Sequence, residues 1–468
     1  MKKYIVLAAA AMSLGLGSCS EDWISDVVPT DKIDSNDALN TLKDGRNAVN
    51  GVLSLMQDED YYGASFIVYG DLKGPDVMST ATNKRNISMY RYTETTEASP
   101  SAMWSRPYKC LVSVNNALQN IDKIEVVSDE EKAQKAEIEA NFIALRALIH
   151  FDLLKVHSRI PTAVAGDLKA ELGVVLADRV ITKDEQPERA NLFDSYKFVM
   201  DDLKAAIKLM PASASTNGWF TQNAVKALYA RVALYRGEYQ TAYDLANEVI
   251  DSKAYSLIPS GDYVESWTNA YNNSEAILTL INTEEDNASR EGIGYLWAET
   301  GYNTMNVAKS LIDVLKADAS DERSAVVNDK KILLKYPDPN FNNILLIRLS
   351  EMYFIAAEAA LELKKPNSEV AKYINAVLAK RTNEKTALAD ADVNIDRILL
   401  EKRKEFVGEG QTFFDLIRNK RDIVRVGDDH LGSAPTEIKY DAYNTILPIP
   451  RNELNSNKNI QQNPVYAK

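Results

Sequence analysis

The stretch that decides the fold is residues 221–252, TQNAVKALYARVALYRGEYQTAYDLANEVIDS. Alanine and leucine recur at three- and four-residue steps from Ala224 to Leu234, which places them on one face of a helix. Gly237 interrupts this period, and a second alanine-rich period follows Tyr239. Small residues where two helices cross, with an aromatic residue opening the second helix, are typical of a tetratricopeptide unit.

Similar patterns recur along the chain. Residues 348–381 show two helical periods around a Lys-Lys-Pro-Asn turn, and 129–156 with 191–209 form another possible pair separated by an insertion. Further helices are predicted at 37–56, at 103–122 and within 393–426. Two clear units are fewer than a free-standing solenoid needs. We therefore predict an all-α domain over 37–468 on a tetratricopeptide-like scaffold, with helical-repeat units near 104–156, 191–252 and 348–381.

Two long stretches, residues 57–102 and 255–347, show no sustained period. Both are rich in polar residues and tyrosine, and only residues 277–281 have the pattern of a strand. The tail from residue 443 is rich in proline and is predicted to be extended. Long loops on a rigid scaffold often carry function, so we expect a loop-rich half that holds the ligand site.

The N-terminus predicts export. Two lysines precede a short apolar run, and small residues lead to Cys19, which together describe a signal peptide over residues 1–18. The apolar run is too short for a permanent membrane span. Leu16-Gly-Ser-Cys19 resembles a bacterial lipobox, so Cys19 is expected to be acylated, with residues 19–36 as a tether. The alternative is an ordinary signal followed by a chance cysteine.

The sequence after this leader resembles a further export signal. Ser20-Glu-Asp22 is similar to the acidic signal that carries lipoproteins of Bacteroidota to the outer face of the outer membrane. We therefore expect a cell-surface lipoprotein anchored in the outer membrane and facing the exterior.

Composition excludes several classes of function. A net charge of −13 without a basic tract argues against nucleic acid as a partner. Cys110 would be the lone thiol once Cys19 is acylated, so no intramolecular disulfide is expected. His150 and His157 lie seven residues apart without an obvious third ligand, so we predict packing or surface roles and no metal site. No phosphate-binding loop or nucleophile motif is present, and no cofactor is expected.

Three carboxylates fall on one face of a predicted helix: Glu401, Glu405 and Glu409. Glycoside hydrolysis uses two carboxylates that face each other across the scissile bond. Three on one helix face, beside Arg403 and Lys404, better fit a solvated or ion-paired network. We predict no catalytic residue.

Aromatic residues point to ligand binding. The chain has 23 tyrosines and 5 tryptophans against 11 phenylalanines, and both types combine an apolar face with a polar group that suits sugar rings or peptides. Aromatics within helical periods are assigned to the core, and those in the two long loops are candidates, although a single loop tyrosine often only seals the core. The candidate ligand residues are Asp71, Asn83, Arg85, Tyr90, Tyr92, Tyr295, Trp297 and Tyr302, with Tyr61, Tyr62, Tyr69, Asp76 and Asn303 nearby in sequence. Trp297→Ala is predicted to weaken ligand binding without changing the melting temperature.

Six motifs, in order across nearly the whole mature chain, resemble the SusD/RagB family of surface nutrient-binding lipoproteins. They are Trp104-x3-Tyr108-x2-Leu111-x3-Asn115-x2-Leu118, Ala144-Leu-Arg-Ala147-x3-Phe151-x-Leu153, Ala227-Leu-Tyr-Ala-Arg231-x2-Leu234-Tyr-x-Gly237-x-Tyr239-x2-Ala242, Arg348-Leu-Ser-Glu351-Met-Tyr353-x2-Ala356-Ala-Glu358-Ala359, Glu401-x-Arg403-x2-Glu405-Phe406-x2-Glu409-Gly410-x4-Asp415-Leu416-x-Arg418, and Pro448-Ile-Pro450-x2-Glu453-Leu454 with Gln462-Asn463-Pro464-x-Tyr466. Gln411 and Phe414 replace an arginine and a tryptophan common in the fifth motif.

The resemblance implies a SusD-like fold and a binding protein without enzymatic activity. It implies capture of an oligomeric nutrient, most often a glycan, and delivery to a SusC-like TonB-dependent transporter that the protein covers as a hinged lid. Peptide is the alternative ligand, as in the RagB branch. A polymer hydrolase and a scaffold that binds only protein are the remaining alternatives.

Overall fold

The computed structural model describes residues 39–98, 100, 102–212, 218–268, 273–382, 387–427 and 429–467. The predicted signal peptide (1–18), the lipidation site Cys19 and the tether (19–36) lie outside these residues. Within them, no helix combines the length and the apolar character that crossing a membrane requires.

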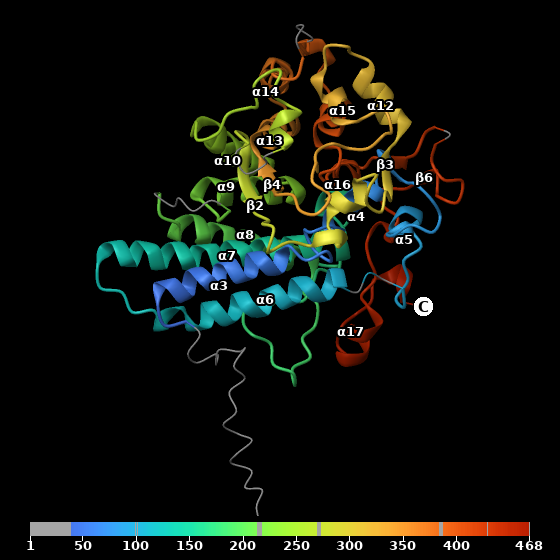
Figure 1. The fold of residues 1–468 in the computed structure, drawn as a ribbon. Helices are drawn as coiled ribbons and strands as arrows, with labels where there is room; N and C mark the ends of the chain where they lie inside the picture. Colours follow the sequence, from blue (N-terminus) through green and yellow to red (C-terminus); the bar gives the residue numbers. More distant parts are fainter. Residues whose placement is uncertain are drawn as a thin grey trace, which may run out of the picture.

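Three helices form a layer along one edge of the molecule (Figure 1). They pack against one another, and they are α3 (Leu42–Met56), α6 (Ala102–Asn120) and α7 (Asp129–His157). Thr41 and Ser128 start α3 and α7, because each side chain accepts a hydrogen bond from the third backbone N–H of its helix. The predicted helices at 103–122 and 129–156 are confirmed, and the first helix begins at Leu42, later than predicted, because Thr41 caps it.

A succession of packed helices rises from this layer (Figure 1). In order of contact they are α7, α8 (Leu192–Leu209), α9 (Gln222–Arg236), α10 (Tyr239–Asp251), α13 (Leu349–Glu362) and α14 (Asn367–Leu378). Buried alanines on α9, α10 and α13 let their backbones approach closely. The helix pairs predicted at 221–252 and 348–381 and the pairing of 129–156 with 191–209 are therefore confirmed.

The other half combines short helices with two-stranded antiparallel sheets (Figure 1). Its helices are α4 (Ser65–Leu72), α5 (Ile87–Arg91), α11 (Ile293–Trp297), α12 (Lys309–Lys316), α15 (Ile395–Phe406), α16 (Thr412–Arg418) and α17 (Arg451–Ser456). The strand pairs of this half are β1 (Val77–Ser79) with β3 (Met305–Val307) and β5 (Ile423–Val424) with β6 (Glu437–Ile438). The pair of β2 (Ala276–Leu280) with β4 (Ile344–Arg348) packs against α9 and α13 of the helical scaffold. Single turns of 3-10 helix lie at 121–123, 161–163, 265–267, 289–291, 322–326, 390–392, 443–445 and 464–466.

The strand predicted at 277–281 is confirmed, shifted by one residue. The long loop predicted over 57–102 also contains regular elements, because α4, β1 and α5 lie within it. Every residue of α4 after Ser65 is buried. A helix covered on all sides has no polar face, and so it lacks the period by which amphipathic helices are recognised.

A buried cluster of arginine and glutamate side chains joins several of these elements. Arg323 Nη2 lies 2.7 Å from Glu401 Oε2, and Arg348 Nη1 lies 2.7 Å from Glu405 Oε1. Arg381 Nη2 lies 2.9 Å from the same Glu405 oxygen. The arginines keep the pKa of Glu405 well below its usual range despite its burial. The sequence predicts a solvated or ion-paired network on this face. The ion pairs are confirmed, and the solvated alternative is wrong because Glu401 and Glu405 are fully buried.

Candidate functional site

The two long loop regions meet through a short antiparallel ladder. Val77 of β1 pairs with Val307 of β3, and Ser79 pairs with Met305. Beyond the ladder, Thr80 Oγ1 donates to the carbonyl of Asn303 at 2.7 Å. Segments more than 200 residues apart in sequence are thus held side by side where candidate ligand residues from both regions lie.

An arginine and a tyrosine from the two loops stack at this junction. The guanidinium of exposed Arg85 lies 4.2 Å from the ring centroid of Tyr302, within range of a cation–π interaction. Glu291 pairs with Arg85 and accepts a 3.0 Å hydrogen bond from the Tyr302 hydroxyl. Exposed ion pairs contribute little to stability, so this arrangement mainly fixes the orientation of the tyrosine ring.

Tyr295 extends this surface. Its ring centroid lies 4.8 Å from that of Tyr302, with the two planes near perpendicular at 79°. The backbone N–H of Tyr302 donates to the Tyr295 carbonyl at 2.9 Å, and Gly301 allows this approach, because a Cβ there would lie 2.2 Å from the same carbonyl oxygen. Tyr295 and Tyr302 are both half-buried, so part of each side chain remains exposed to solvent. We call Arg85, Glu291, Tyr295 and Tyr302 the tyrosine–arginine surface.

Asn83 is exposed on the same loop as Arg85. Lys84, between them, anchors that loop, because its Nζ donates to the Tyr302 carbonyl at 2.7 Å. Asn303 is half-buried and adopts a left-handed backbone conformation with φ of 44°. Non-glycine residues in this conformation store backbone strain and often occur at functional sites. Asn83, Arg85, Tyr295 and Tyr302 are therefore the candidates that the structure leaves accessible.

Four other candidates lie in the core, which corrects their predicted place on a ligand surface. Asp71, Tyr90, Tyr92 and Trp297 are each at most 8% exposed, and Trp297 is fully buried. Asp71 accepts a 3.1 Å hydrogen bond from the backbone N–H of Gly410, and burial raises the pKa of its carboxyl well above the usual value. Tyr90 contacts His430 Nδ1 through its hydroxyl at 2.8 Å. These side chains seal the core beneath the loops.

The further loop residues behave in the same way. The hydroxyls of Tyr61 and Tyr62 both donate to buried Asp152, at 2.8 and 2.7 Å. Tyr69 donates to the carbonyl of Thr445 at 2.7 Å, and Asp76 pairs with Arg403. These side chains are buried by partners far away in the sequence, and no local pattern shows such contacts.

The histidines pack, as predicted. His150 Nδ1 lies 2.8 Å from the carbonyl of Arg146, and its Nε2 accepts from the N–H of Ala177 at 3.0 Å. This pair of contacts requires a neutral ring, and burial lowers the pKa of His150 to about 4. His157 lies edge-on to Trp104 with centroids 4.9 Å apart, and burial lowers its pKa to about 3.

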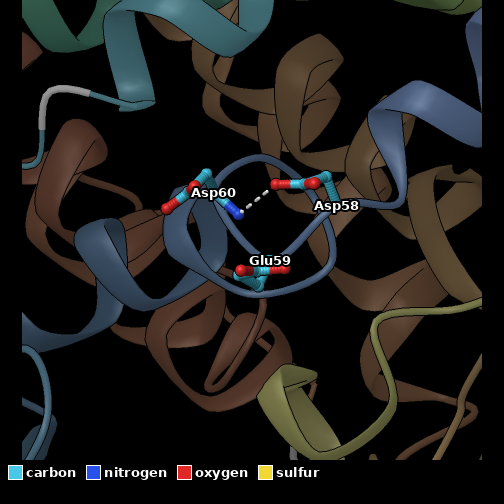
Figure 2. A group of neighbouring side chains, drawn as sticks. All are labelled: Asp58, Glu59 and Asp60. Atoms are coloured by element: carbon cyan, nitrogen blue, oxygen red, sulfur yellow. Dashed lines mark hydrogen bonds between the residues drawn. The ribbon is translucent and has the colours of Figure 1, made fainter.

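One group of acidic residues lies close together in the described part of the chain. Figure 2 shows Asp58, Glu59 and Asp60 around a tight turn, with ligand-capable oxygens within 4.8 Å of one another. Asp58 accepts from the N–H of Asp60 at 3.0 Å and pairs with Arg106 at 2.6 Å. Burial, with the neighbouring carboxylates, raises the pKa of Asp60. The turn uses these groups internally, and we assign no ion to them.

Comparison with known proteins identifies the family. Residues 26–234 match a SusD-like family model described as starch-binding associating with outer membrane, and residues 338–466 match the SusD family model. A solved SusD superfamily protein from Bacteroides vulgatus ATCC 8482 is 32% identical, with a TM-score of 0.86, and the match covers 92% of this chain and 100% of that chain. The chain belongs to the SusD family.

Other SusD-family proteins match this chain over nearly its whole length. A solved structure from Bacteroides thetaiotaomicron VPI-5482 is 30% identical with a TM-score of 0.84, and the match covers 91% of this chain and 100% of that one. SusD-like protein P2 of Formosa agariphila is 23% identical over 533 residues, and the match covers 100% of both chains. The predicted family and the predominantly helical fold are thereby confirmed.

Sequence reasoning missed Glu291 and a neighbouring pocket lined by asparagines. Glu291 directly precedes residues 292–302, the glycine- and aromatic-rich stretch that contains Tyr295 and Tyr302. The signal in the sequence is a charged residue next to loop aromatics. The asparagines come from residues 282–287 and 340–343, which β2 and β4 bring together. The run Asn340-Phe-Asn-Asn343 directly before a strand was the only signal in the sequence.

Proposed function

We propose that this chain is a surface lipoprotein that captures an oligomeric glycan and delivers it to a SusC-like TonB-dependent transporter as its lid. The observation that carries the proposal is the tyrosine–arginine surface, built from two loops on the scaffold of a SusD-family protein. Aromatic faces stack on the C–H faces of sugar rings, and Arg85, Glu291 and Asn83 offer polar partners for hydroxyls.

Binding and release without bond cleavage is the proposed mechanism. The family model matched by residues 26–234 is described as starch-binding and associated with the outer membrane, which supports both the ligand class and the location. Glu401 pairs with buried Arg323. Buried arginines hold the pKa of Glu405 well below its usual range, whereas a general acid needs a raised pKa. Acylation at Cys19 would hold the protein at the membrane.

Calorimetry on the soluble form, residues 20–468, tests the ligand class against panels of glycans and mixed peptides. We expect glycan binding without cleavage, and about tenfold weaker binding by Tyr302→Ala because a stacking face is lost. Tyr443→Ala is the matched control, since Tyr443 also lies near a guanidinium, that of Arg159, but outside the tyrosine–arginine surface. Peptide binding alone, or released product, would contradict the proposal. Co-purification of the full-length acylated chain with a SusC-like transporter tests the lid.

A further inference from the structure

A small pocket borders the tyrosine–arginine surface. Its buried floor includes Asn282, Gly292 and Gly294, and its rim includes half-buried Asn342 and exposed Asn340. Residues 292–294 line the pocket and lie between Glu291 and Tyr295 in the chain, so the pocket and the surface share the start of α11. We propose that this amide pocket is a subsite for an uncharged sugar hydroxyl or hydroxymethyl group. The inference deepens the proposed glycan capture and rests on it.

The floor presents a hydrogen-bond acceptor that lacks a donor. The Asn282 backbone N–H donates to Asn343 Oδ1 at 2.8 Å, and its side-chain Nδ2 donates to the Asn342 carbonyl. These contacts fix the orientation of the amide and leave Asn282 Oδ1 buried, with no hydrogen-bond partner among the described residues. A buried acceptor without a donor has lost its hydrogen bond to water, so a ligand hydroxyl that donates to it gains affinity.

The rim amide is held in place by its own turn. Asn342 Oδ1 accepts from the N–H of Asp338 at 3.0 Å, and Asn342 Nδ2 donates to the Asp338 carbonyl at 2.6 Å. With its amide committed to that turn, Asn342 is not free to swing inward and satisfy Asn282. The acceptor on the floor is thus preorganised for an incoming group.

Glycines keep the pocket hollow and close to the aromatic rings. A Cβ at Gly294 would lie 2.1 Å from the Asp338 carbonyl oxygen, so only glycine allows α11 to approach this turn. The N–H of Ile293 donates to the Gly63 carbonyl at 2.8 Å, which fastens the start of α11 to the opposite wall. The helix that carries Tyr295 is therefore set against the pocket.

The chemistry of the lining selects a neutral group. None of the described residues that line the pocket carries a charge, although 26% of the chain is charged, and four of them are asparagines. A hydroxyl donates a hydrogen bond to Asn282 Oδ1, whereas a carboxylate would bring a second acceptor against it. A uronic acid is therefore disfavoured where a neutral hexose is accepted.

The test fills the pocket with one methyl group. Gly292 has a φ of −70°, which alanine adopts without strain, and its Cβ would lie 3.1 Å from Ser289 O and 3.5 Å from Ala288 Cβ. Ala288→Leu, on the rim, is a second filling variant. Gly166→Ala is the matched control, because nothing lies within 4 Å of its Cβ position. The probes are neutral gluco-, galacto-, manno- and xylo-oligosaccharides and uronic-acid oligosaccharides, measured by calorimetry and saturation-transfer NMR.

We expect at least one neutral oligosaccharide to bind at least tenfold more tightly than its uronic-acid counterpart. Gly292→Ala and Ala288→Leu should weaken that binding about tenfold at an unchanged melting temperature, while Gly166→Ala should leave it unchanged. Full binding by both filling variants, or equal binding of the uronic acid, would overturn the subsite but leave glycan capture standing. Binding of peptides alone, or of no oligosaccharide in the panel, would overturn both.

Discussion

Trp297 ends the five-residue helix α11, whose first residues border the amide pocket, yet its own ring is fully enclosed. Its role at the residue scale is therefore to hold α11 in place from below. Tyr295, two residues earlier, is only half-buried, so part of its side chain is exposed to solvent. On so short a helix, position relative to the core decides whether an aromatic residue packs or binds.

Trp297→Ala is expected to lower the free energy of unfolding by about 3–5 kcal/mol, because it leaves a large cavity in a packed core. Urea denaturation of the variant measures this loss. Any loss of affinity for glycan, expressed per folded molecule, should be smaller than that of Tyr302→Ala, because Trp297 acts only through the position of α11. Trp297→Phe should be milder, since it retains most of the buried area. A stable variant with weakened binding would return Trp297 to the ligand surface.

The sequence alone does not separate the buried loop tyrosines from the half-buried ones. Tyrosines at 90, 92, 295 and 302 share a residue type and a loop context, but the first two are buried and the last two are only half-buried. What separates them is tertiary contact, such as the guanidinium of Arg425 lying 4.3 Å from the Tyr90 ring. Such contacts join residues more than 300 positions apart, and no local pattern encodes them.

At the scale of elements, Gly237 separates α9 from α10. It has a φ of +82°, and its N–H bonds to the carbonyls of Ala233 and Leu234 at the end of α9. The left-handed conformation costs other L-residues about 1–2 kcal/mol. This glycine therefore sets the turn that the sequence pattern predicted.

We expect Gly237→Ala to destabilise the protein by about 1 kcal/mol, as judged by chemical denaturation. Gly51→Ala is the control, because there we expect the free energy of unfolding to rise instead of fall. Gly51 lies within α3 with nothing within 4 Å of its Cβ position, so alanine there should stabilise by about 0.5–1 kcal/mol. Equal effects at both positions would show that the turn does not depend on the backbone conformation of Gly237.

Long elements with a buried face or a clear start were predictable, and elements only a few residues long were not. The helices α8 and α10 each have one buried face, whereas α7 and α9 are buried on most sides along much of their length but are long and begin at the capping residues Ser128 and Thr221. In contrast, α4 is buried on every side, and β1 and β3 have three residues each. A three-residue strand is recognisable only by its partner, which here lies more than 200 positions away.

At the scale of the whole molecule, the buried ion cluster links parts of the chain from residue 275 to residue 409. Glu275 precedes β2, Arg348 joins β4 to α13, and Arg381 follows α14. All three side chains are buried, and both arginines pair with Glu275 and with Glu405 on α15. The cluster thus connects the helical scaffold to the half that carries the tyrosine–arginine surface.

Glu405→Gln is expected to cost about 3–5 kcal/mol at pH 7, because it leaves buried arginines without their shared carboxylate. Since the folded pKa of Glu405 lies well below its unfolded value near 4.5, its contribution is present above that pH and is lost as the pH falls through the folded pKa. The difference in free energy of unfolding between variant and parent should therefore become smaller as the pH drops below about 4. Urea titrations from pH 7 to pH 3 measure it, with exposed Glu284→Gln as the control expected to change stability by less than about 0.5 kcal/mol. A gap that stayed constant with pH would mean that Glu405 acts through packing rather than through its charge, and the cluster would then not couple the two halves electrostatically.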